Sequence, residues 1–253
     1  MNRRTMKSMM KKVLAAAMAA ALCLTAFVAC GGSGAKTNEA KGTLAQFEEP
    51  VKGQQIATIK VKDYGEIKAM LFPKGAPKAV ENFVTHAKEG YYDGVKFHRV
   101  IADFMAQTGD PEGTGMGGES IWGEGFEEEY DENLRNFTGA LAMARTSAPS
   151  SLGSQFYIVN TPASEISDDM LDIMPQWIKQ SYGLDVAFPD NVKAKYKEVG
   201  GQPTLDGFYT VFGQVYEGLD IISQIMQQET DPDTNMPKTD IIIESITISE
   251  YEG

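Results

Sequence analysis

The sequence predicts a mainly β domain: a closed, antiparallel barrel of eight strands, capped by two helices and carrying one α-helical insertion. Three observations favour this fold class. Short segments with alternating apolar and polar residues recur along the chain, separated by Gly, Pro and Asp turns. Two further segments carry apolar residues at helical spacing. A third region, about residues 164–201, changes character and is helical almost throughout. Short alternating strands with frequent turns are typical of barrels.

The first half of the domain predicts a hairpin, a helix and a second hairpin. Tyr64-Gly65 is the turn of the first hairpin, and Pro77 suits the first turn of the helix, which Gly90 ends. Ala102-Asp103 forms a tight connection in the second hairpin. The predicted strands cover residues 55–61, 66–72, 96–101 and 104–108, and the helix covers 77–87.

The second half adds four strands, one framework helix and the insertion. Asp168-Asp169 is expected to cap the first insertion helix and Gly183 to close it. The apolar stripe of this helix favours packing against the barrel, with a partner-binding face as the alternative. The predicted strands cover residues 134–144, 154–160, 210–216 and 241–248, the framework helix 218–228, and a second insertion helix 191–199.

Residues 97–110 concentrate unusual side chains. They hold one cation (Arg99), two large apolar residues (Phe104 and Met105) and one amide (Gln107). Strand alternation projects Arg99, Met105 and Gln107 from one face. An apolar floor edged by a guanidinium and an amide suits a neutral ligand that contains amides. The stretch holds no nucleophile and no obvious proton carrier. From spacing alone, however, a structural ion pair is the better interpretation of Arg99.

Two other motifs have weaker functional interpretations. Residues 111–118 match G-x-G-x-x-G, but no helix pattern follows and nearby acids would repel a pyrophosphate, so we expect a plain glycine loop. Five acids lie within residues 126–132, which favours a solvated acidic face over a metal site. The chain has two histidines, too few for a histidine-rich metal centre. We expect no cofactor.

The N-terminus predicts export and lipid attachment. Residues 1–29 hold a basic start and an apolar run that ends in small residues, as in a secretory signal peptide. Cys30 follows directly and is the expected lipidation site, as in bacterial lipoproteins; a plain signal peptide or a signal anchor is the alternative. Residues 30–53 are expected to be a flexible tether before a domain over 54–253. Cys23 and Cys30 are the only cysteines, so the domain has no disulfide.

The charge of the chain excludes one class of partner. Removing residues 1–29 removes five cations and no acid, which takes the net charge from −12 to −17. A strongly acidic domain does not bind nucleic acid and has no broad electrostatic hold on anionic lipid. Attachment to a membrane would therefore rely on acyl chains. The expected location is extracytoplasmic and lipid-anchored, and the domain is expected to be a monomer.

An ordered set of motifs resembles the cyclophilin-type peptidyl-prolyl cis-trans isomerases over about residues 54–250. The set comprises Phe97-His98-Arg99-Val100-Ile101 with Phe104-Met105 and Gln107, Gly123-Glu124 with Phe126-Glu127, Leu141 to Ala144, Gly153-Ser154-Gln155-Phe156, and Leu205-Asp206-Gly207 with Val211-Phe212-Gly213.

The resemblance implies a site and a reaction. It implies that Arg99 is catalytic and that X–Pro bonds in proline-containing peptides and unfolded exported proteins are the substrate. It also implies that His98 is a framework residue beside the site. Substrate-binding roles fall on Phe104, Met105, Gln107, Gln155, Tyr157, Leu205 and Tyr209, with the main chain at Ala144 and Arg145.

The sequence departs from the family pattern at a few of these positions. Tyr157 stands where many members have Phe, Tyr209 where many have His, and Arg145 where Asn is frequent. Thr204 replaces the Trp that supports cyclosporin binding in sensitive members, so weak cyclosporin binding is expected. Two other functions stay open at this point: a non-catalytic module that binds proline-containing segments, and a chaperone that shields unfolded chains with the insertion.

Overall fold

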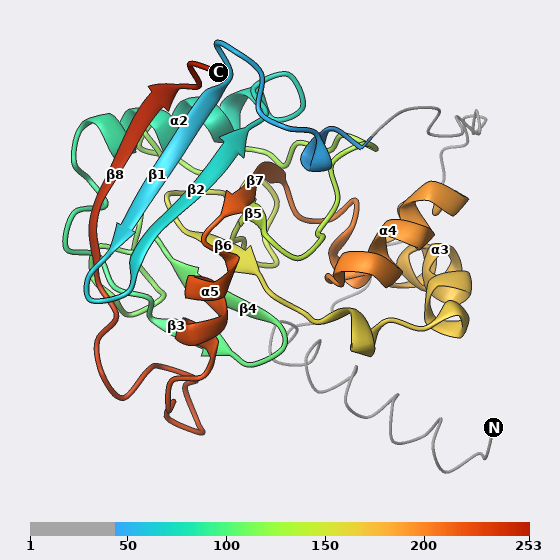
Figure 1. The fold of residues 1–253 in the computed structure, drawn as a ribbon. Helices are drawn as coiled ribbons and strands as arrows, with labels where there is room; N and C mark the ends of the chain where they lie inside the picture. Colours follow the sequence, from blue (N-terminus) through green and yellow to red (C-terminus); the bar gives the residue numbers. More distant parts are fainter. Residues whose placement is uncertain (1–43) are drawn as a thin grey trace.

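Eight strands form one antiparallel sheet in the computed structural model, which describes residues 44–253 (Figure 1). Their order across the sheet is β3-β4-β6-β5-β7-β2-β1-β8. The number of strands and their antiparallel pairing confirm the sequence prediction. The strands are β1 Gln55–Val61, β2 Gly65–Leu71, β3 Arg99–Ile101, β4 Met105–Thr108, β5 Ala140–Met143, β6 Phe156–Val159, β7 Val211–Glu217 and β8 Ile243–Glu250.

The sheet curls strongly, but its strand ladders do not close into the expected barrel. Within residues 44–253, the edge strands β3 and β8 share no ladder; an isolated bridge between Lys96 and Ile242 links the chain beside them. The loop before β8 covers the edge of β3 instead, since the Val100 N–H donates to the Asn235 carbonyl at 2.8 Å. Covering an edge with a loop satisfies its backbone groups without an eighth strand pairing between β3 and β8.

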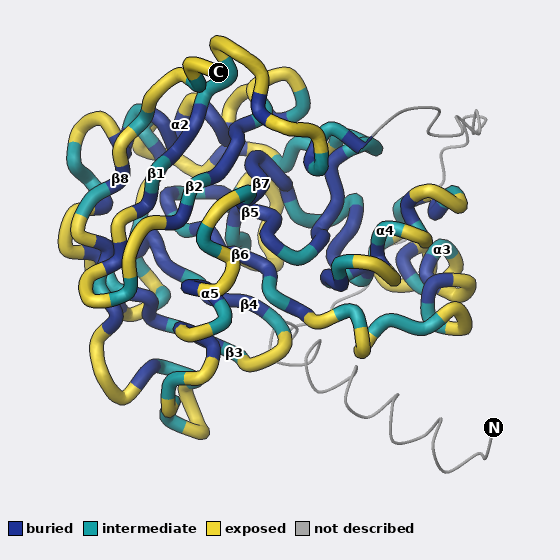
Figure 2. Tube along the Cα trace, viewed as in Figure 1, coloured by how far each residue is buried: buried dark blue, intermediate teal, exposed yellow. Residues whose placement is uncertain are grey.

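Two framework helices fill the concave side of the sheet. Helix α2 (Pro77–Lys88) begins with Pro77 in its first turn and packs against β8, and α5 (Leu219–Met226) packs against β2, β3 and β4. Their apolar faces meet the inner residues of the strands in one large core, whose buried segments are dark in Figure 2. Burial of this surface is the main stabilising contribution to the fold.

The central strands β5 and β6 are buried on both faces. Phe156 and Ile158 point into the main core, whereas Tyr157 and Val159 belong to a second apolar cluster on the outer face of the sheet. Strands buried on both faces read as nearly continuous apolar runs. The outer cluster is the part of the molecule that carries the predicted site.

The helical segment, residues 164–201, contains α3 (Asp168–Tyr182) and α4 (Asp190–Val199) beside the sheet (Figure 1). Its apolar stripe packs with residues from elsewhere in the domain, including Phe137 and Leu44. The stripe is therefore packed within the domain, on residues that precede β1 and β5 rather than on the strands themselves. The cap of α3 differs from the prediction: the Ser167 side chain, rather than Asp168-Asp169, accepts the Met170 N–H.

Gly200 closes the helical segment where no other residue fits. Its φ of 83° is in the left-handed region, and an added Cβ would lie 1.9 Å from the Thr161 carbonyl oxygen. The chain thus returns to the sheet through a backbone contact that excludes any side chain.

The predicted signal peptide and the predicted lipidation site Cys30 lie outside the described residues, as does most of the predicted tether. The end of the tether is corrected by the structure. Ala45–Phe47 forms a short 3-10 helix, and Gln46 is only 2% exposed. Its amide accepts the Arg135 N–H at 2.8 Å and donates to the Arg135 carbonyl at 2.9 Å. The predicted tether is largely polar and has no helical or strand periodicity, so the sequence did not indicate that Gln46 would be buried against Arg135.

None of the helices in residues 44–253 is both long and apolar enough to cross a bilayer.

Candidate active site

The β3–β4 hairpin brings the predicted cation and amide together. Arg99 pairs with Gln107 across the hairpin and Ile101 pairs with Met105, so Arg99, Met105 and Gln107 share a face, as expected. The Arg99 Nη1 donates to Gln107 Oε1 at 3.2 Å and lies 4.0 Å from Met105 Sδ. A guanidinium thus sits at the edge of an apolar surface, half-buried.

The apolar surface beside Arg99 is the outer cluster of the sheet. Met105 is 1% exposed and forms its floor. Six predicted site residues belong to the cluster: Phe104, Met105, Ala144, Tyr157, Leu205 and Tyr209. The Tyr157 and Tyr209 rings meet edge to face, 5.8 Å apart. Burial raises the pKa of both phenols, so they remain neutral donors in an otherwise apolar wall.

The Arg99 guanidinium has no carboxylate partner in residues 44–253. Its side-chain bonds go to Gln107 and Met105. Burial lowers the pKa of Arg99 and the Tyr209 phenol raises it; no acid contributes. An arginine pKa starts so high that the group stays charged. This geometry disfavours the structural ion pair that spacing alone suggested.

Gln107 is held in turn by Gln155 and the glycine loop. The Gln107 Nε2 donates to Gln155 Oε1 at 2.9 Å. The Gln155 Nε2 donates to the carbonyl oxygens of Gly117 and Gly115 at 2.7 and 3.2 Å. A line of amides therefore runs from the loop to Arg99 and fixes the orientation of each member. The glycine loop, expected to be plain, supports the site.

Asp110 organises that loop and was not foreseen. Its carboxylate accepts the backbone N–H groups of Glu112, Thr114, Gly115 and Gly117. Burial would raise the pKa of Asp110, but these four bonds outweigh it and hold the pKa below its ordinary value. The available signal was an aspartate directly before a glycine-rich run, where such side-chain-to-backbone turns are common.

Arg145 contributes to the rim through packing. Its guanidinium lies 4.0 Å from the centre of the Phe208 ring and its Nη2 is 3.0 Å from Glu128 Oε1. The Ala144 N–H already donates to the Gln155 carbonyl at 2.9 Å. The Ala144 N–H is therefore already bonded, so a main-chain contact from Ala144 to a peptide would use its carbonyl oxygen.

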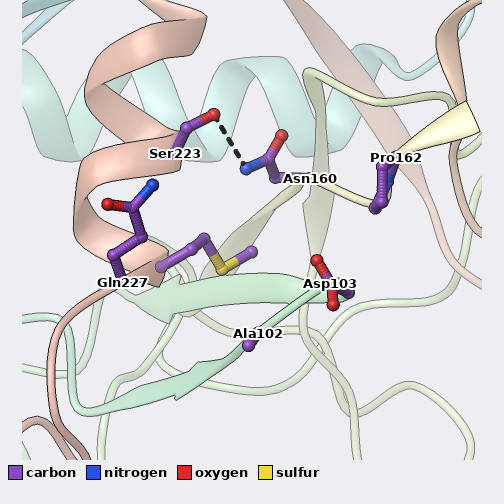
Figure 3. Close-up of a pocket in the computed structure, with 7 residues that line it drawn as sticks. Ala102, Asp103, Asn160, Pro162, Ser223 and Gln227 are labelled. Carbon is purple, nitrogen blue, oxygen red and sulfur yellow. Dashed lines mark hydrogen bonds between the residues drawn. The ribbon is translucent and has the colours of Figure 1, made fainter.

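A separate hollow of about 240 Å³ lies between the β3–β4 turn, the end of β6 and α5 (Figure 3). Asn160 and Ser223 point toward each other there, with Asn160 Nδ2 donating to Ser223 Oγ at 3.2 Å. None of the predicted site residues lines this hollow, and its lining contains no cation. It lacks the combination of apolar floor and positive edge found around Arg99. The residues that line it are Ala102, Asp103, Asn160, Pro162, Ser223, Met226 and Gln227.

Comparison with known proteins agrees with this geometry. Residues 56–248 match the family model described as cyclophilin type peptidyl-prolyl cis-trans isomerase/CLD. The chain is 45% identical over 205 residues to a putative peptidyl-prolyl cis-trans isomerase of Staphylococcus saprophyticus, covering 81% of this chain and 98% of that protein. A Staphylococcus aureus protein of the same description is 44% identical over the same shares.

The fold also resembles a crystal structure of a cyclophilin-type isomerase from Cryptosporidium parvum. That match has a TM-score of 0.60 and 29% identity, and covers 78% of this chain and 99% of the other. A second structure of the Cryptosporidium protein, determined in the presence of the dipeptide Ala-Pro, has a TM-score of 0.59 and 30% identity. The family match spans most of the described chain, and the chain belongs to the cyclophilin-type peptidyl-prolyl cis-trans isomerases.

Proposed function

We propose that Arg99 accelerates rotation of X–Pro bonds by donating a hydrogen bond to the prolyl nitrogen. In a planar X–Pro bond that nitrogen's lone pair is delocalised into the carbonyl. Twisting the bond frees the lone pair, and a donor aimed at it then binds the twisted form selectively. Selective binding of the transition state is what raises a rate. The observation that carries this proposal is a charged guanidinium beside an apolar surface, with no described carboxylate to occupy it.

The energy required is within reach of such a site. Uncatalysed X–Pro rotation takes about 10–100 s at 25 °C. Shortening it to milliseconds takes about four decades of rate, or about 5.5 kcal/mol. A charge-assisted hydrogen bond in a partly desolvated site, together with orientation of the peptide, supplies an energy of this order. Metal, nucleotide and covalent intermediates have no role in this scheme.

The predicted side chains then divide into groups with different roles. Phe104, Met105, Tyr157, Leu205 and Tyr209 clamp the proline ring by apolar contact, and Gln107 together with the main chain at Ala144 and Arg145 holds the rest of the peptide. Gln155 acts through Gln107 and the glycine loop, since its amide keeps Gln107 in place.

An isomerisation assay separates this enzyme from a non-catalytic binding module. A proline-containing peptide is assayed with wild-type protein, Arg99→Ala and Lys62→Ala, the last removing an exposed cation in the β1–β2 turn. We expect Arg99→Ala to lower kcat/KM at least a hundredfold and Lys62→Ala to leave it unchanged. Absence of wild-type acceleration would favour the binding module, and equal rates for wild type and Arg99→Ala would remove the role of Arg99.

We further propose that the enzyme acts on exported proteins while anchored through a lipid on Cys30. The support is the order of the N-terminal segments: a basic start, an apolar run ending in Phe27-Val28-Ala29, and then Cys30. Expression of Cys30→Ala in a bacterial host, followed by separation of membranes from soluble material, tests it. The wild type should sediment with membranes and Cys30→Ala should not. Equal membrane fractions for both proteins would instead indicate a signal anchor.

A further inference from the structure

A buried line of hydrogen bonds connects the outer apolar cluster of the sheet to the helical segment. The Tyr157 hydroxyl donates to Asn136 Oδ1 at 3.1 Å. The Asn136 backbone N–H and Nδ2 both donate to Asp206 Oδ1, at 2.9 and 3.1 Å. On the far side, the Tyr196 hydroxyl of α4 donates to Asp206 Oδ2 at 2.8 Å. All four residues are buried.

Asp206 is the centre of this arrangement. It is fully buried and directly follows Leu205, which, like Tyr157, belongs to the outer apolar cluster. Arg135, 1% exposed, places its Nη1 3.5 Å from Asp206 Oδ2. The Arg135 Nη2 donates to the carbonyl of Ala187 in the helical segment at 3.0 Å. The segment therefore contacts the Asp206 carboxylate directly through Tyr196 and indirectly through Arg135.

We propose that Tyr196 and Asp206 are positioning residues of the proline pocket, which they hold in shape by fixing Tyr157 and Leu205. The helical segment then contributes to substrate binding by keeping Tyr157 and Leu205 in position. This inference rests on the proposed function, because it takes the outer apolar cluster to be the proline pocket.

The chemistry of Tyr157 explains why its wall needs such support. A buried hydroxyl without a partner costs free energy, so the ring takes the orientation in which its hydroxyl reaches Asn136. The amide of Asn136 can present its oxygen only while its nitrogen is held by Asp206. Tyr196 occupies the other carboxylate oxygen. Removing the Tyr196 hydroxyl therefore loosens Asp206, then Asn136, and finally the ring of Tyr157 that faces Tyr209.

The effect should appear in substrate binding more than in turnover. The pocket wall contacts the proline ring in the planar and the twisted states alike. Losing such uniform binding raises KM and leaves kcat nearly unchanged. Arg99 acts only on the twisted state, so its loss lowers kcat. The two roles are distinguishable in one kinetic experiment.

The experiment compares Tyr196→Phe, Tyr157→Phe and their double variant in the full domain. Tyr196→Phe keeps the ring that packs 4.3 Å from Phe137 and removes only the hydroxyl. We expect Tyr196→Phe to raise KM about three- to tenfold, as loss of one buried hydrogen bond implies, with kcat within about twofold. In the Tyr157→Phe background the same change should have no further effect, because the line is already broken.

Ile178→Val is the matched control, since it trims a buried residue of the same helical segment outside the line of bonds. It should lower the melting temperature while KM stays unchanged. An unchanged KM in Tyr196→Phe, multiplicative effects in the double variant, or an equal rise of KM in Ile178→Val would each overturn the proposal.

The dissociation constant of the dipeptide Ala-Pro, measured by NMR titration, gives a second readout that does not depend on turnover. Its Kd should rise in Tyr196→Phe by the same factor as KM, and an unchanged Kd would overturn the proposal. If Arg99→Ala left kcat intact, the catalytic scheme would fail while this positioning role would still be decided by the dipeptide Kd.

Discussion

At the scale of single residues, two amides orient the Arg99 guanidinium. Gln107 accepts one of its N–H groups at 3.2 Å, and Gln155 holds Gln107 at 2.9 Å. Arginine has five N–H donors, so a single amide acceptor leaves others available to a ligand. A carboxylate in the same place would compete with the weakly basic prolyl nitrogen for the guanidinium. The neutral partner therefore suits the proposed chemistry better than a charged one would.

The two histidines predict how stability depends on pH. Burial lowers the pKa of both His86 and His98 from the ordinary value of 6.5, although Glu119 and Asp110 respectively oppose the shift. Arg99 and Lys96 add to the lowering at His98. Below about pH 6.5 the unfolded chain binds more protons than the folded one, so stability is present above this pH and is lost as pH falls. The slope is at most about 1.4 kcal/mol per pH unit for each histidine.

Urea denaturation at pH 5.5, 6.5 and 7.5 measures this slope. His98→Gln should reduce the loss of stability between pH 6.5 and 5.5 relative to wild type, even if it lowers stability at every pH. The carboxylate of Asp110 gives a loss of the same sign only as pH falls toward and below 3.8, because its pKa is lowered from that value. A stability that is flat from pH 7.5 to 5.5 would contradict the assignment.

Strand alternation predicts which candidate site residues share a face, but it does not predict residues that act through hydrogen bonds between distant parts of the chain. Alternation by itself predicts that Arg99, Met105 and Gln107 share one face, and the register of the β3–β4 hairpin confirms it. Asp206 gave no such sign, since its bond to Asn136 joins positions 70 residues apart. Buried polar pairs of this kind depend on the tertiary fold, which local periodicity does not encode.

At the scale of elements, helix α2 is capped by a residue outside the helix. Pro77 begins it, yet Ala76 offers no side-chain cap. Glu129 supplies the acceptors, taking the backbone N–H groups of Lys78 at 3.0 Å and Ala79 at 2.9 Å. The acid-rich stretch that looked like a solvated face thus fixes a framework helix to the chain around β5. A carboxylate at a helix N-terminus also interacts favourably with the helix dipole.

Glu129→Ala should lower the free energy of unfolding by about 1 kcal/mol, the usual cost of losing a helix cap. Glu127→Ala is the matched control: Glu127 Oε1 lies 2.5 Å from Lys78 Nζ, but both side chains are exposed, so its loss should lower the stability much less than Glu129→Ala does. Urea denaturation midpoints with unchanged slopes would measure both. Equal effects of the two substitutions would show that Glu129 has no capping role.

At the scale of the whole molecule, two segments outside the sheet meet at the same short stretch before β5. Gln46 bonds both backbone groups of Arg135 and also donates to Gln214 Oε1 at 2.9 Å. The helical segment packs on Phe137 and pairs Gly201 with it in an isolated bridge. Phe47 and Tyr196 contact Phe137 from these two segments, with ring centres 5.1 and 4.3 Å away. The eight strands and both framework helices followed from sequence periodicity, whereas this junction did not.

The junction predicts how far the N-terminus can be shortened. A domain beginning at residue 44 should melt at the same temperature as a chain beginning at Cys30. A domain beginning at residue 50 should melt several degrees lower, because the Arg135 backbone groups and Gln214 lose buried partners worth about 1–3 kcal/mol in total. Thermal unfolding monitored by circular dichroism compares the melting temperatures of the two shortened domains. Equal melting temperatures would mean that residues 44–49 are part of the tether after all.

The most direct test of the central claim measures binding and exchange of the same peptide at once. An Ala-Pro peptide is observed by NMR with wild-type protein and with Arg99→Ala, giving both Kd and the rate of cis-trans exchange while bound. If Arg99 acts on the twisted bond alone, Arg99→Ala keeps Kd within about threefold while bound-state exchange falls at least a hundredfold, a loss of about 2.7 kcal/mol or more of transition-state stabilisation. A variant that binds weakly but exchanges the bound peptide at the wild-type rate would contradict the account.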